Sequence, residues 1–131
     1  MGNFIKGTSS VFATYFVYLL GGLDIALQSL LVVIVLDYIT GIAKSYVSKT
    51  LNSNKGFRGI VKKLAILCMV ALAVIIDHIA GETGLIRTVV IYYLVANEGL
   101  SILENLAEMD IIVPSVLKEK LEQIKGGENH E

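Results

Sequence analysis

Three long apolar blocks constrain the fold of this chain more than any other feature. They cover about residues 23–43, 64–80 and 85–106, and few charges interrupt them. Hydrophobic residues make up 54% of the 131 residues, and the mean hydropathy is +0.68. An average soluble domain has roughly 45–50% apolar residues even with glycine counted. Because about 20 apolar residues in a helix cross a bilayer, we predict an all-α integral membrane protein with three transmembrane helices.

The segments around these blocks complete a single membrane domain, residues 1–125. Residues 1–22 hold five of the ten aromatic residues, and aromatic rings favour the headgroup zone of a bilayer. We therefore predict an N-terminal interfacial helix there, with a fourth span from Phe4 to Leu23 as the alternative. Pro114 is well placed to start a short amphipathic C-terminal helix, 114–125. Residues 126–131 are predicted to form a disordered tail.

Positive charge is concentrated between the first two blocks. The segment 44–63 contains six cations and no acidic residue, whereas the net charge of the whole chain is −1. Short loops rich in lysine and arginine remain in the cytoplasm. We therefore predict a cytoplasmic basic loop, with a turn at 52–56, and a cytoplasmic C-terminus. A nucleic-acid patch is not expected, because no base-reading fold presents these charges. The topology-setting residues are Lys44, Lys49, Lys55, Arg58, Lys62 and Lys63.

The third block carries a polar stripe that is unsuited to lipid. At 100° per residue, positions 97, 101, 104 and 108 fall on one narrow face of a helix. Glu98 and Asn105 widen this face to roughly a third of the circumference. The candidate stripe residues are Asn97, Glu98, Ser101, Glu104, Asn105 and Glu108.

Other polar residues interrupt the first two blocks and the start of the third. Asp37 and Thr40 share one face of the first span, and a buried charge near a span centre costs about 2.5–3.5 kcal/mol. Asp77 and Arg87 are expected at similar depth near the opposite end, where they are predicted to form an ion pair. Gly41 and Gly99 are predicted sites of close helix contact.

Two interpretations of the polar residues remain open at this stage. In the first, they join neighbouring helices as structural hydrogen bonds, for example from Glu98 or Asn97 to Asp37 or Thr40. In the second, the stripe borders an aqueous path. Three helices are too few to enclose a channel, so the second interpretation predicts a homo-oligomer.

Catalytic motifs are sparse. We find no glycine-rich phosphate loop, no nucleophile elbow and no Cys/His cluster, so neither an enzyme nor a cofactor is expected. Two other classes of membrane protein are alternatives to a pore-forming protein. A diacylglycerol-kinase-like membrane enzyme has only Glu104, Asn105 and Glu108 as candidate residues. A small oligomeric transporter or channel would use Glu98 as a proton-coupled carboxylate, but antiparallel transporters of this kind need a weak charge bias, and the bias here is strong.

Several consecutive runs carry a family resemblance. They are LDYITG at 36–41, LNSNKGFRGIVKK at 51–63, ANEGLSILEN at 96–105 and Val113-Pro114 before the final helix. Together they resemble the toxin-secretion/phage-lysis holin family of Gram-positive phages and clostridia, from about Leu23 to Lys125.

This resemblance implies a pore-forming protein of the bacterial cytoplasmic membrane. Holins oligomerise at a set time and open lesions through which an endolysin reaches the cell wall, and members encoded beside clostridial toxins are associated with toxin release. The expected partners are therefore other copies of the chain and the lipid bilayer. An endolysin or exported toxin would be a functional partner without necessarily making direct contact. The family supplies no catalytic residues.

Overall fold

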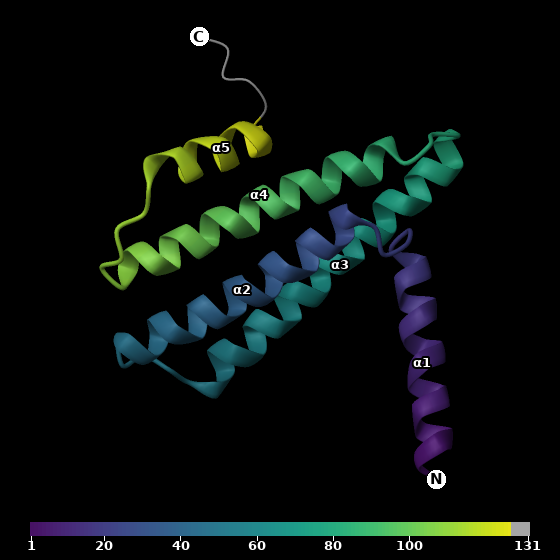
Figure 1. The fold of residues 1–131 in the computed structure, drawn as a ribbon, viewed down its shortest axis with the longest axis horizontal. Helices are drawn as coiled ribbons and strands as arrows, with labels where there is room; N and C mark the ends of the chain where they lie inside the picture. Colours follow the sequence, from purple (N-terminus) through teal and green to yellow (C-terminus); the bar gives the residue numbers. More distant parts are fainter. Residues whose placement is uncertain (127–131) are drawn as a thin grey trace.

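The computed structural model describes residues 1–126, which form five helices (Figure 1). They are α1 (Gly2–Leu19), α2 (Ile25–Val47), α3 (Ser53–Ala80), α4 (Leu85–Glu108) and α5 (Ser115–Gly126). The all-α prediction is confirmed, and α2, α3 and α4 are each long and apolar enough to cross a membrane. The chain is a multi-pass membrane protein. Of the predicted tail, Gly126 ends α5, and 127–131 lie outside the described residues.

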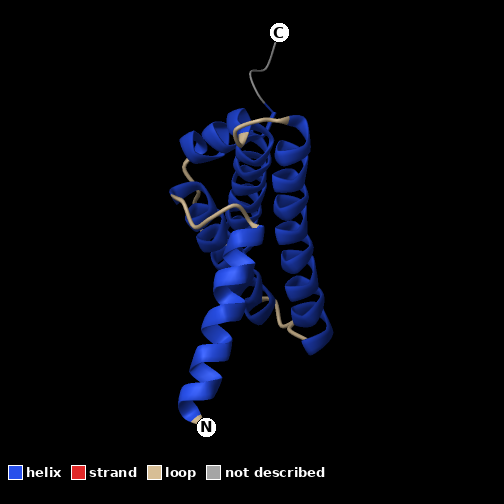
Figure 2. Cartoon of the chain, turned by 90° about the vertical axis from the view of Figure 1, so that its right-hand side faces the viewer, coloured by secondary structure: helices blue, strands red, loops and turns tan. Residues whose placement is uncertain are grey.

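The three long helices form an elongated bundle (Figures 1 and 2). α4 packs along both α2 and α3, whereas α2 and α3 touch over a much shorter stretch. At 1.5 Å per residue, each long helix spans about 35–42 Å, more than a bilayer core of about 30 Å. The buried apolar core between them consists mainly of Leu27, Leu30, Ile34, Val70, Ile91 and Leu94.

Local sequence signals fix the starts of α2 and α3. The Asp24 side chain accepts a hydrogen bond from Leu27 N at 2.9 Å, and its place after Gly21-Gly22, at the start of the first apolar block, is itself a sequence signal for an N-cap. Asn52 does the same for α3, accepting from Lys55 N at 2.8 Å. Each cap satisfies one of the backbone N–H groups that the first helical turn leaves without a partner.

The basic segment 44–63 is mostly helical, so the prediction of a loop there was wrong. α2 continues to Val47 and α3 begins at Ser53, which leaves only 48–52 as a connection. The residues expected to form a turn instead build the first turn of α3.

Two glycines lie inside the first turns of α3, where glycine is unfavourable for a helix. Gly56 and Gly59 let the Tyr38 ring approach, and a Cβ at Gly59 would lie 3.3 Å from Tyr38 Cε2. This packing offsets the poor helix propensity.

The N-terminal helix α1 points away from the bundle, and the Gly21-Gly22 turn connects it to α2 (Figures 1 and 2). Its aromatic side chains are exposed, including Phe4, Phe12 and Tyr15, and no residue within it is buried. α1 is not among the three helices that meet the length and hydropathy of a membrane span. An interfacial position for α1 stays a prediction.

Candidate functional site

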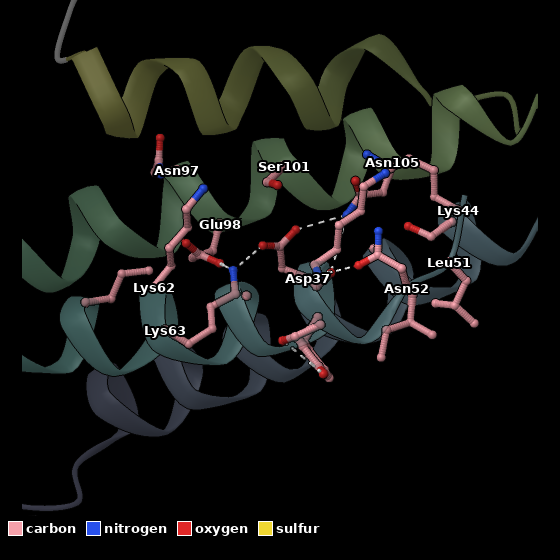
Figure 3. A pocket seen from close by; sticks show the side chains of 18 residues that line it. Asp37, Lys44, Leu51, Asn52, Lys62, Lys63, Asn97, Glu98, Ser101 and Asn105 are labelled. Carbon is pink, nitrogen blue, oxygen red and sulfur yellow. Dashed lines mark hydrogen bonds and ion pairs between the residues drawn. The ribbon is translucent and has the colours of Figure 1, made fainter. Parts of the chain in front are cut away.

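A buried ionic cluster joins the three long helices near their middles. Lys63 of α3 donates to the carboxylates of both Asp37 on α2 and Glu98 on α4 (Figure 3). The three side chains are only 17%, 11% and 5% exposed, respectively. Because one ammonium faces two carboxylates, ionisation of all three gives a local charge of −1. This cluster is placed where a charge is expensive unless it is paired.

Asn105 ties this cluster to the next turn of α2. Its amide Nδ2 lies 3.0 Å from Asp37 Oδ1 and 3.0 Å from Thr40 Oγ1, and it donates to both. We call Asp37, Thr40, Lys63, Glu98 and Asn105 the Lys63 cluster. Within residues 1–126, every buried side-chain nitrogen and oxygen has a hydrogen-bond partner. The cluster therefore meets the requirement for polar groups inside a membrane protein.

A cavity of about 500 Å³ lies beside the Lys63 cluster, between α2, α3 and α4 (Figure 3). Asn97, Ser101 and the members of the cluster other than Thr40 line it, together with Lys44 of α2 and Lys55 and Lys62 of α3. The cavity is partly open, and its lining extends from the cluster to Leu51 and Asn52 at the basic end of the bundle.

Arg87 forms a second ionic cluster at the other end of the bundle, and its partner differs from the predicted one. Its guanidinium donates to Asp24 from Nη1 at 2.7 Å and from Nη2 at 3.2 Å, and also to the carbonyls of Leu20 and Gly22. The predicted ion pair with Asp77 was therefore wrong. Asp77 accepts instead from the backbone nitrogens of Ile86 and Arg87, at 2.9 and 2.8 Å. An anion at a helix N-terminus is favourable, which explains this exchange of partners.

The Arg87 guanidinium constrains both the backbone at Gly21 and the pKa of Asp24. Gly21 has φ +87°, and a Cβ there would lie 2.5 Å from Arg87 Nε, so the guanidinium needs glycine at this turn. The hydrogen bond from Arg87 holds the pKa of Asp24 below its ordinary value of 3.8, and the Leu27 amide acts in the same direction. We call Asp24, Asp77 and Arg87, with the two carbonyls, the Arg87 cluster.

The structure divides the predicted polar stripe of α4 between two faces. Glu98 and Asn105 are buried in the Lys63 cluster, and Asn97 and Ser101 line the cavity. Glu104 is exposed and lies beside a separate groove between α4 and α5. Glu108 is exposed and pairs with Lys44 at 3.2 Å. The stripe is therefore broader than a single face.

The C-terminal helix α5 packs along α4 (Figure 1). A Cβ at Gly99 would lie 3.0 Å from both Leu121 Cδ atoms, so glycine permits this contact. Lys125 Nζ lies 5.8 Å from the centroid of the Tyr93 ring, a cation–π distance. Gly99 thus contacts α5 of the same chain, and a role for it in helix contacts between chains stays a prediction. Gly41 faces Asn105, where a Cβ would lie at an ordinary 3.7 Å.

Two members of the clusters were missed in these roles by sequence reasoning. Lys63 was assigned to the basic loop, and Asp24 was recognised only as a helix cap. A signal for Lys63 was present: Phe57, Ile60, Val61 and Leu64 follow the apolar spacing i, i+3, i+4, i+7 of a helix. The segment upstream of the apolar block therefore already had helical character. No sequence signal specified that Asp24 would meet Arg87.

This arrangement can be compared with known proteins. The sequence matches the bacteriophage holin family over residues 14–126. The chain belongs to the bacteriophage holin family. That family is non-enzymatic, and the resemblance noted from the sequence is confirmed. No solved structure matches the chain.

Relatives of this holin-family chain occur in several Gram-positive bacteria and a phage. An uncharacterised 14.9 kDa protein of the nagH 3′ region of Clostridium perfringens is 43% identical over 123 residues, 93% of each chain. The uncharacterised protein YqxH of Bacillus subtilis is 38% identical over 109 residues, covering 83% of this chain and 77% of YqxH. A probable holin of Bacillus phage phi105 is 35% identical over 99 residues, covering 76% and 73%.

Proposed function

We propose that this chain is a working holin, which oligomerises in the bacterial cytoplasmic membrane and opens lesions that release an endolysin or a toxin. The observation that carries the proposal is the Lys63 cluster beside its open cavity. Ionic groups near the middle of three membrane helices are expensive in lipid. They are expected where helices face one another or face water. A pore-forming assembly has both kinds of surface, because its helices contact neighbouring chains on one side and line water on another.

The proposal requires several copies of the chain. The apolar part of the bundle is packed with leucine, isoleucine and valine, and the cavity of about 500 Å³ beside the Lys63 cluster is far too small to pass a protein. A single chain therefore has no room for a path wide enough for a protein. A homo-oligomer in which neighbouring chains contribute polar faces would provide one.

The proposed mechanism has two states. In the dispersed chain, Lys63, Asp37, Glu98 and Asn105 satisfy one another, as in this structure. Above a threshold concentration, chains assemble, and the cavity face of α4, with Asn97 and Ser101, turns toward water. The groups that were paired within one chain then become hydrated or pair with a neighbouring chain.

The proposed topology places the basic end of the bundle in the cytoplasm. Residues 44–63 include the five-residue connection 48–52 and the first turns of α3, with six cations and no acid. Basic residues at the ends of membrane helices favour the cytoplasmic side. With that orientation α2 enters the cytoplasm, α3 leaves it and α4 returns, which leaves α5 on the cytoplasmic side.

The transporter alternative receives less support from the geometry. A proton-coupled carboxylate must bind and release its proton freely during the cycle. Glu98 is instead held by Lys63, which Asp37 also binds. This pairing makes Glu98 a structural partner in the dispersed state.

The first test is induced expression in bacteria with and without a co-expressed endolysin. We expect abrupt loss of membrane potential in both cultures, and rapid lysis only where the endolysin is present. Potential is followed with a voltage-sensitive dye and lysis by turbidity. Normal growth with an intact potential, at a membrane level of the protein verified by immunoblot, would contradict the proposal.

A second test asks which face of α4 lines the lesion. Asn97→Leu/Ser101→Leu removes polarity from the cavity face, whereas Glu104→Leu changes the face toward α5. We expect dye release from liposomes to fall strongly in the first variant and to persist in the second. Cross-linking checks that both variants still assemble. Undiminished release by the cavity variant with normal assembly would exclude this face as the lining.

A further inference from the structure

The cavity beside the Lys63 cluster carries positive charge that the cluster does not use. Its lining includes four lysines (44, 55, 62 and 63) and two acids (37 and 98), so the formal balance is 4 − 2 = +2. Lys63 is engaged by the two acids, and Lys44 pairs with Glu108. Among residues 1–126, neither Lys55 nor Lys62 has an acidic partner. The excess charge therefore belongs to these two side chains.

Lys55 and Lys62 lie on the same face of α3 and line the same cavity. With Gly59 and Ile66 they form the spacing i, i+4, i+7, i+11 on α3, which is one face of a helix. All four line the cavity. In Figure 3, Lys62 extends from α3 toward α4 near Asn97, on the side opposite the Asp37–Asn105 contact. Gly56 and Gly59 also line the cavity, and Tyr38 of α2 lies against both of them.

The rest of the lining indicates the chemical class of the ligand. Asn52, Ser45 and Asn97 add hydrogen-bonding groups, and Ile42, Leu51 and Ile66 add apolar surface. The cavity is open and lies at the basic end of a multi-pass membrane protein, where phospholipid headgroups are the most abundant anions. Basic pockets between membrane helices bind phosphate-bearing headgroups. A ligand with an anionic phosphate and an apolar portion matches both kinds of surface.

We propose that this cavity binds the phosphate group of an anionic phosphate ester, held by Lys55 and Lys62. The inference does not depend on lesion formation, because it concerns the dispersed chain. Two sources carry this chemistry: an anionic phospholipid such as phosphatidylglycerol, and a soluble phosphate ester such as glycerol phosphate. The experiment separates them.

The test uses the full chain, purified in a mild neutral detergent and examined by native mass spectrometry. It is mixed with equal amounts of phosphatidylglycerol and phosphatidylcholine of identical acyl chains. Lys55→Gln/Lys62→Gln removes the proposed ligands, and Lys49→Gln/Arg58→Gln removes the same charge from the same segment without touching the cavity lining. Lys55→Arg/Lys62→Arg keeps the charge. Circular dichroism and elution volume check that all variants fold alike.

The wild-type chain is expected to retain phosphatidylglycerol over phosphatidylcholine. The affinity should fall on the order of 20-fold in the Gln variant of Lys55 and Lys62, because each basic residue near an anionic headgroup contributes roughly fivefold. The control and the Arg variant should keep the preference. Equal retention of the two lipids, or an equal loss in the Lys55/Lys62 and Lys49/Arg58 variants, overturns the proposal when glycerol phosphate also fails to bind.

Glycerol phosphate alone, tested by the same method at millimolar concentration, decides the source. If it binds the wild type, is lost from the Lys55/Lys62 Gln variant and displaces the lipid, the site takes soluble phosphate esters. If it does not bind while phosphatidylglycerol does, the site takes the lipid headgroup. Binding of glycerol phosphate that is unchanged in the Gln variant contradicts the assignment to Lys55 and Lys62.

Discussion

The Arg87 cluster and the Lys63 cluster each contain one cation and two acidic residues, but they differ in where the cation finds its acceptors. Arg87 lies where helices begin and end, and it binds two backbone carbonyls and a carboxylate that is 52% exposed. Lys63 lies near the middle of the bundle, and its two partners are 11% and 5% exposed. The first cluster joins chain connections, and the second joins three helices.

This difference suggests different roles. At the Arg87 cluster, loss of one partner leaves groups that water or backbone can satisfy. At the Lys63 cluster, the ammonium of Lys63 is the one counter-ion that both carboxylates share among residues 1–126, and the Asn105 amide donates to Asp37 but not to Glu98. A rearrangement that moves α3 relative to α4 would therefore break the Lys63–Glu98 ion pair, at a large cost in free energy. That is a suitable property for a state that must persist until assembly begins.

The largest effect is expected from Lys63→Met. This change leaves Asp37 and Glu98 close together without their counter-ion, and breaking a buried ion pair costs about 3–5 kcal/mol. Unfolding in mild detergent, followed by circular dichroism, measures the loss. Lys62→Met is the matched control, because the neighbouring side chain is exposed and has no acidic partner within residues 1–126. Equal stability of the two variants would show that the cluster is already hydrated.

Arg87→Gln should have a smaller effect, about 2–3 kcal/mol, because the lost hydrogen bonds include charged ones but Asp24 can be hydrated. We also expect faster proteolysis at the Gly21-Gly22 turn, since Arg87 binds the carbonyls on both sides of Gly21. Arg58→Gln, an exposed change of the same kind on α3, serves as the control. If Arg87→Gln costs more than Lys63→Met, the comparison between the two clusters is reversed.

Gly99→Ala addresses the face of α4 opposite the Lys63 cluster. The new Cβ would lie 3.0 Å from Leu121, and overpacking of this kind costs about 1 kcal/mol or more. We expect amide exchange in α5 to become about fivefold faster for a weakening of about 1 kcal/mol. Gly41→Ala gains the same intrinsic helix propensity and meets only an ordinary contact, so it should leave α5 unchanged. Unchanged exchange in both variants would show that Leu121 moves aside without cost.

The smallest effect concerns pH at the Arg87 cluster. The pKa of Asp24 is lowered in the folded chain, chiefly by Arg87, so its contribution is fully present above the ordinary value of 3.8. That contribution is lost as the pH falls through the lower folded pKa. Because Asp24 is half exposed, we expect less than about 1 kcal/mol. Thermal unfolding from pH 5 to pH 2.5 should show a smaller decline in Asp24→Asn than in the wild type. Parallel declines would mean that Asp24 does not contribute.

Hydropathy and local capping made the membrane character, the three long helices and the Asp24 cap predictable from the sequence. Such features depend on residues close together in the chain, so a window of one helix contains the information. The polar character of α4 was visible for the same reason, because helical periodicity alone places 97, 98, 101 and 105 near one another. Family membership followed from consecutive runs of residues.

The partners of the charged groups were decided only by the tertiary structure. Both Asp77 and Asp24 lie within reach of Arg87. Arg87 pairs with Asp24 because α4 begins beside Asp77, and the backbone N–H groups of its first turn occupy the Asp77 carboxylate. Lys63 joins Asp37 and Glu98 because α3 extends as a helix through the basic segment and carries the lysine to the level of both acids. The sequence by itself determined which residues are too polar for lipid. Ion-pair partners depend on the register and neighbours of whole helices, which only the packed bundle fixes.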